Sequence, residues 1–161
     1  MRERSEMSLE IKIERAFRAR DCPSSLIERR AAIICDDEDA LWFYGRKWQE
    51  ISLDDWRAHS GAFFAFTAEA FLYYLPSVLT LSAGGRCDLL AASSLIGMLD
   101  RMPEPAYWDE FLLKRMSGLN QEEYGVIMEW LLSLSGTAMY EEVSLMRAYQ
   151  TVDLLATGRP A

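Results

Sequence analysis

TAEAFLYYLPSVL, residues 67–79, is the stretch that decides the fold class of this chain. Thr67 is a favoured helix N-cap, and Glu69 places a negative charge in the first turn, where the helix dipole stabilises it. Pro76 removes one intrahelical hydrogen bond, so we expect it to kink this helix or to split it in two. Apolar side chains recur at helical spacing and predict a buried face made of Phe71, Tyr74, Leu75, Val78 and Leu79.

Similar signals on both sides of this stretch predict further helices and few strands. Ser8 is an expected N-cap, and Ser52 with Asp55 and Asn120 with Glu123 have the spacing of capping boxes. The last helix is expected to bury one face composed of Met139, Val143, Met146, Tyr149 and Val152. Besides residues 67–79, the expected helices span residues 8–20, 40–44, 52–59, 88–100, 106–116, 120–135 and 138–156.

No internal repeat or long linker divides the chain. We therefore expect an all-α fold, a compact single-domain bundle of about six to seven helices. The bundle would span residues 8–157, between flexible ends at 1–7 and 158–161. For residues 24–36 the sequence allows two structures. One is a short helix that begins at Ser24 or Ser25, and the other is a turn that leads into an extended segment.

The composition is that of an ordinary globular protein, because half of the 161 residues are apolar and about a quarter are charged. The N-terminus lacks the apolar core of a signal peptide, and no stretch approaches the ~18 apolar residues of a membrane span. These features predict a cytoplasmic protein that does not enter a membrane. The three cysteines, odd in number and widely spaced, are expected to be reduced structural thiols.

The charge distribution favours a basic partner. The chain has 17 basic and 25 acidic side chains, a net charge of -8, which repels the phosphates of nucleic acid and argues against binding it. Residues 1–35 carry a net charge of +2 and residues 36–161 a net charge of -10. We therefore expect the larger part of the surface to attract a basic protein.

Two groups of residues could carry chemistry. The acidic run Asp36–Asp39 could bind Mg²⁺ or Ca²⁺, but it lacks the glycine and the downstream glutamate of an EF-hand loop and suits the positive end of a following helix. His59 and Cys87 could form a base and a nucleophile with Asp88, but they lie in different segments and in no recognisable motif. We expect no catalytic residue, no metal and no cofactor.

Aromatic residues are concentrated in one part of the chain. Eleven of the nineteen lie between Trp42 and Tyr74, and most of them should be core. Adjacent residues on a helix point in different directions, so some of these rings should reach the surface, where Trp and Tyr favour protein binding. The candidate binding residues are Trp42, Tyr44, Trp48, Tyr73 and Tyr74.

The same region resembles a known family. Residues 43–48, FYGRKW, followed by residues 66–71, FTAEAF, and residues 73–76, YYLP, resemble the pattern of a bacterial family catalogued as a domain of unknown function. That family has a Gly-Lys-Trp element before a Thr/Ser-Pro-Glu-Ala-Phe-Arg-Tyr-Tyr-Leu-Pro motif. Here Ala68 stands in place of the proline and Leu72 in place of the arginine. The resemblance implies an α-helical bacterial protein and transfers no catalytic residue.

Three functions from different classes fit these observations. The favoured one is a non-catalytic protein-binding module, similar to an immunity protein or an antitoxin, whose acidic surface faces a basic partner. The second is a homodimeric structural protein that uses the aromatic segment as its interface. The third is a small hydrolase or transferase that uses His59 and Cys87, or the acidic run.

Overall fold

A computed structural model describes residues 6–28 and 34–158 of the chain. This part contains nine α-helices, seven of them with seven or more residues, and no strand, which confirms the all-α class. No helix in the described ranges is long and apolar enough to cross a membrane. The α-helices are α1 (Leu9–Phe17), α2 (Cys35–Leu41), α3 (Leu53–Ala58), α4 (Ala62–Ala65), α5 (Ala68–Ser82), α6 (Leu90–Leu99), α7 (Glu110–Met116), α8 (Gln121–Leu134) and α9 (Glu142–Thr157), and the short 3-10 helices are η1 (Trp48–Glu50), η2 (Ala83–Gly85) and η3 (Pro105–Tyr107).

Helix α5 is the centre of the core. Every residue from Ala70 to Leu79 is buried, and the helix packs against α1, α6 and α7. The Thr67 hydroxyl accepts a hydrogen bond from the Ala70 amide at 3.1 Å, so the predicted N-cap is confirmed. Pro76 lies inside α5 and does not split it into two helices.

Two tryptophans form hydrogen bonds with serine hydroxyls that α5 brings into the core. The indole nitrogen of Trp56 donates to the hydroxyl of Ser77 at 2.9 Å, and that of Trp130 donates to the hydroxyl of Ser82 at 3.0 Å. Ser82 in turn donates to the Val78 carbonyl. A buried indole N–H or hydroxyl without such a partner would destabilise the fold, so these bonds allow Ser77 and Ser82 to lie in the core.

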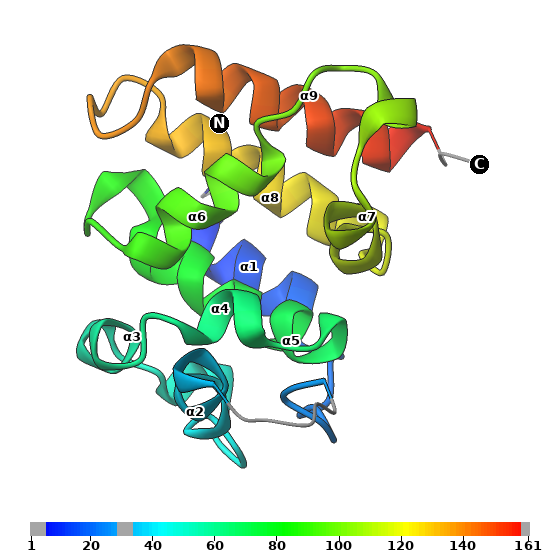
Figure 1. Ribbon diagram of the computed structural model, residues 1–161. Coiled ribbons are helices and arrows are strands. Elements are labelled where there is room, and N and C mark those ends of the chain that lie inside the picture. Colours follow the sequence, from blue (N-terminus) through cyan, green and yellow to red (C-terminus); the bar gives the residue numbers. More distant parts are fainter. Residues whose placement is uncertain (1–5, 29–33, 159–161) are drawn as a thin grey trace.

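The other helices lie on two sides of α5. Helix α1 packs on α5 and α8, and α9 packs on α8 and α6. Figure 1 shows α9 at one end of the molecule and α2 and α3 at the opposite end. The two ends are therefore separate surfaces.

The turn after α2 is fixed from the core by Tyr74. Its buried hydroxyl lies 2.7 Å from the carbonyl oxygen of Phe43 and 2.7 Å from that of Arg46. Gly45, between them, has φ +73°, a left-handed conformation that glycine adopts without strain. One side chain of α5 thus holds the whole turn in place.

The predicted caps and ends of the helices are confirmed in part. Ser52 with Asp55 and Asn120 with Glu123 form the two capping boxes. The first helix ends at Phe17, not at residue 20, and Ser8 precedes it without a side-chain hydrogen bond. The helix predicted at 106–116 is divided into η3 and the shorter α7. Residues 1–5 and 159–161 of the predicted flexible ends lie outside the described residues.

Four other predictions about the chain are corrected or remain partly open. Helix α2 begins at Cys35 and contains the four acids that we expected to precede it, and α9 begins at Glu142, four residues later than expected. Val152 of the predicted face of α9 is buried, together with Leu145, Ala148 and Leu155, whereas Val143 and Met146 are exposed. Within the undecided segment 24–36, Ile27 forms an isolated antiparallel bridge with Phe66, and residues 29–33 lie outside the described ranges.

Removing the Tyr74 hydroxyl should destabilise the protein. In Tyr74→Phe the carbonyls of Phe43 and Arg46 lose a buried donor, so we expect the free energy of unfolding to fall by about 1–3 kcal/mol. Urea denaturation followed by circular dichroism measures this change. Tyr44→Phe is the matched control, because the Tyr44 side chain is mostly exposed. Equal stability of the two variants would contradict the role assigned to Tyr74.

Candidate functional site

The acidic run is built into helix α2, and two of its carboxylates hold the local structure together. Asp37 is buried and accepts a hydrogen bond from the Ile34 amide at 3.1 Å. Asp39 accepts one from the Gly61 amide at 3.0 Å, and its other oxygen lies 3.5 Å from Nδ1 of His59. Asp39 therefore connects α2 to the chain between α3 and α4.

Gly61 is the point where α2 comes closest to that chain. A Cβ atom at this position would lie 2.3 Å from Oδ1 of Asp36 and 2.9 Å from Oδ2 of Asp39. A side chain there would force the carboxylates of Asp36 and Asp39 to move and would disturb the hydrogen bond from the Gly61 amide to Asp39, so glycine suits this close approach. Within the run, Asp36 and Glu38 are exposed, and Asp36 lies against Gly61.

Trp42 is covered by two neighbours. The imidazole of His59 stacks on its ring, with a centroid separation of 4.3 Å and an angle of 18° between the planes. The guanidinium carbon of Arg46 lies 3.9 Å from the centroid of the Trp42 ring, and Nε of Arg46 donates to the Trp42 carbonyl. Such cation–π and stacking contacts fix the ring in one orientation. Trp42 is thus partly buried and contributes only an edge to the surface.

The structure separates the five candidate binding residues into two groups. Trp48, Tyr73 and Tyr74 are buried in the hydrophobic core and do not form a surface. Tyr44 is 73% exposed, and Trp42 is partly exposed. The sequence could not separate them, because the spacing of Tyr73 and Tyr74 on a helix does not reveal that α5 is enclosed on all sides.

An apolar and acidic surface lies on the outward side of α2. Ile34, Glu38 and Leu41 follow one another at spacings of four and three residues, and all three are exposed. Tyr44 continues this line, because its amide donates to the Leu41 carbonyl in the turn that ends the helix. We call these four residues, Ile34, Glu38, Leu41 and Tyr44, the α2 surface. The sequence pattern indicates Tyr44 but not Ile34 and Leu41, because the exposure of these two residues depends on where α2 begins.

The contacts of His59 do not bring it together with Cys87. Its ion pair and ring contacts are with Asp39, Trp42 and Phe43, all in α2 or the following turn. Cys87 lies between η2 and α6. Over the residues that the structure describes, no three His, Cys, Asp or Glu side chains gather closely enough to bind a metal ion.

A groove of about 1040 Å³ lies at the other side of the molecule, between η3, α7 and the ends of α8 and α9. The described residues that line it carry no charge. The Trp108 indole donates to the Met102 carbonyl, and the Tyr124 hydroxyl donates to the Met116 carbonyl. These two polar groups are satisfied within the protein, so they do not indicate a ligand.

Comparison of the chain with family models, with curated proteins and with solved structures gave no match. The resemblance between residues 43–79 and the bacterial family of unknown function therefore stays a prediction.

The buried Tyr73 should titrate late and make the protein sensitive to alkali. Burial, and next the neighbouring Cys22 thiol, raises the pKa of Tyr73 to about 12, from an ordinary value of about 10. The folded state thus favours the neutral phenol, and the stability that this contributes is complete below pH 10 and is lost as pH rises from 10 through 12.

Absorbance at 295 nm, which follows tyrosinate, measures this titration. We expect Tyr73→Phe to remove one ionisation near pH 12 from the folded protein. The variant should also lose less stability between pH 10 and 12 than the original chain. If Tyr73→Phe leaves the alkaline titration unchanged, the buried position of the phenol is wrong.

Proposed function

We propose that this chain is a non-catalytic protein-binding module that recognises a basic partner through the α2 surface, in the manner of an immunity protein or an antitoxin. The observation that carries the proposal is the exposure of Tyr44 beside Ile34, Glu38 and Leu41. Large aromatic and aliphatic side chains, exposed in a line and accompanied by an acid, are what a protein-binding hot spot needs.

The charge around this surface supports a basic partner. Residues 34–61, which form α2, the following turn and α3, contain seven acidic and three basic side chains. One of the basic groups, Arg46, is already engaged with Trp42. An excess of negative charge steers a basic protein toward this end of the molecule and makes the association rate depend on ionic strength.

The rigidity of the surface also supports binding. Asp39 fixes α2 against Gly61, and the Tyr74 hydroxyl fixes the turn that presents Tyr44. A surface that is already ordered loses little conformational entropy when a partner binds, so more of the contact energy appears as affinity. The enzyme alternative lacks such support, because His59 is engaged with Trp42 and Asp39 and no contact connects it to Cys87.

Photo-crosslinking in cells of the native host tests this function. A photoreactive phenylalanine analogue that replaces Tyr44 should form a crosslink to one basic protein. The yield should fall several-fold when Leu41→Ala is added, because the neighbouring apolar contact is lost. Raising the salt concentration of a lysate from about 0.05 to 0.5 M should weaken the same complex, since the attraction is screened.

The matched control carries the photoreactive group at Tyr107, which is 79% exposed but lies in η3, away from α2. This position should give no crosslink to the same protein. A crosslink of equal yield from Tyr107, or none from Tyr44, would refute a binding function for the α2 surface. A crosslink between two copies of this chain would favour the homodimer instead.

A further inference from the structure

Helix α9 leaves part of its apolar surface uncovered. Its inner face packs on α6 and α8, but Val143 is 54% exposed and Met146 is 55% exposed. Leu132, on the outer side of α8, is 60% exposed. Exposed apolar side chains that gather on neighbouring helices mark an interaction surface more often than isolated ones do.

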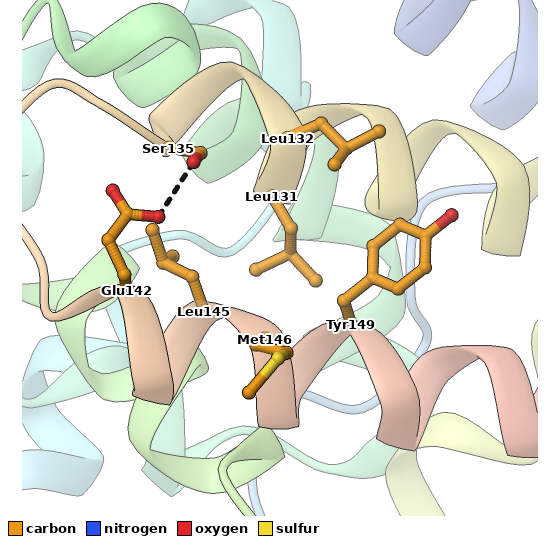
Figure 2. A pocket seen from close by; sticks show the side chains of 7 residues that line it. All are labelled: Leu131, Leu132, Ser135, Glu142, Leu145, Met146 and Tyr149. Atoms are coloured by element: carbon orange, nitrogen blue, oxygen red, sulfur yellow. Dashed lines mark hydrogen bonds between the residues drawn. The ribbon is translucent and has the colours of Figure 1, made fainter.

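Leu132 and Met146 border a groove between α8 and α9. Figure 2 shows Leu131 of α8 and Leu145 and Met146 of α9 around one space, with Tyr149 at one end of it. The groove has a volume of about 200 Å³. This is below the ~300–1,000 Å³ of typical small-molecule pockets, so the groove suits a side chain of a partner protein. The flexible thioether of Met146 allows its wall to adapt to different side chains.

A fixed negative charge closes the other end of the groove. The Glu142 carboxylate accepts a hydrogen bond from the Ser135 hydroxyl at 2.7 Å and one from the Gly136 amide at 2.6 Å (Figure 2 shows the first). The Gly136 amide, and next the Ser135 hydroxyl, lowers the pKa of Glu142. The side chain is exposed, and its oxygens have lone pairs left for a cation from outside.

We propose that this α8–α9 groove binds an amphipathic helix of a partner protein, with an apolar side chain between Leu131 and Met146 and a lysine or arginine on Glu142. An apolar groove lined by helices accepts such a helix through residues spaced three and four apart. The surface is separate from the α2 surface, and the proposal does not depend on the function assigned to that surface.

The charges near the groove favour a basic helix over a second copy of this chain. Glu141 precedes Glu142, and both are exposed. The one basic residue of α9, Arg147, is already paired with Asp100 at the end of α6. If α9 of a second copy lay in the groove, its acidic residues would face Glu142, and its arginine would already be paired with Asp100. A basic helix would instead place a cation on Glu142.

Selection from a displayed peptide library tests the proposal. The library holds 18-residue amphipathic helices whose apolar stripe varies among Leu, Ile, Met and Phe and whose flanking positions vary between Lys and Glu. We expect the chain to enrich helices with Lys at one flank. The selected peptide should bind at least tenfold more weakly to Met146→Arg, because the arginine places a charge where the apolar side chain of the peptide contacts the groove.

Further variants assign the contacts. Glu142→Gln keeps acceptor capacity but removes the charge, so it should weaken binding of the Lys-bearing peptide several-fold. It should not weaken binding of the Glu-bearing counterpart, because a repulsion between two carboxylates is removed. Met102→Arg, at an exposed methionine outside the groove, and Tyr44→Ala, in the α2 surface, should leave binding unchanged. Circular dichroism of each variant verifies that it is folded.

Four results would overturn the proposal. They are the absence of any enriched peptide, enrichment of Glu-bearing helices, equal binding by Met146→Arg, and loss of binding in Tyr44→Ala. Sedimentation equilibrium that reveals a dimer abolished by Met146→Arg would show that a second copy occupies the groove.

Discussion

The hydroxyl of Tyr74 joins helix α5 to the turn after α2, which carries the exposed side chain of Tyr44. Its two close carbonyl neighbours belong to Phe43 and Arg46, so a single phenol fixes both ends of the turn after α2. The ring of Tyr74 also stacks on Phe66 and meets Phe43 edge to face. The direction of Tyr44 and the position of α2 depend on this contact. A solvated turn with the same sequence would have many conformations, and here the core selects one.

The sequence reveals the helical class because the signals for it are local. Thr67, Ser52 and Asn120 cap helices in the structure as their spacing predicts, since a cap needs only the three or four residues that follow it. The predicted start of α9 is wrong, because an apolar periodicity does not show where a helix begins. Met139 and Val143 continue an apolar periodicity, but the segment before Glu142 is a turn with Ala138 at φ 62°. The predicted stripe runs from the exposed Val143 and Met146 to the buried Val152, so the periodicity alone does not reveal which side of α9 faces the core.

The candidate surface could be predicted only in part, because exposure depends on contacts between distant residues. Tyr44 and Tyr74 belong to the same aromatic-rich stretch, yet one is exposed and the other is enclosed by rings from three segments. The same holds for Glu123. The local pattern predicts that Glu123 takes part in a helix cap but does not predict its partly buried ion pair with Arg20, 103 residues away. The spacing of residues along one helix therefore predicts neither the enclosure of Tyr74 nor the pairing of Glu123 with Arg20.

The two indole–serine hydrogen bonds give the protein internal optical probes. Trp56 reports on the side of α5 that carries α2, α3 and α4, and Trp130 reports on the side that carries α8 and α9. Both rings are buried and hydrogen-bonded, so each should emit at shorter wavelength than an indole in water. Single-tryptophan versions of the chain would therefore show, by the midpoint of each red shift, whether the two ends of the molecule unfold together or one after the other.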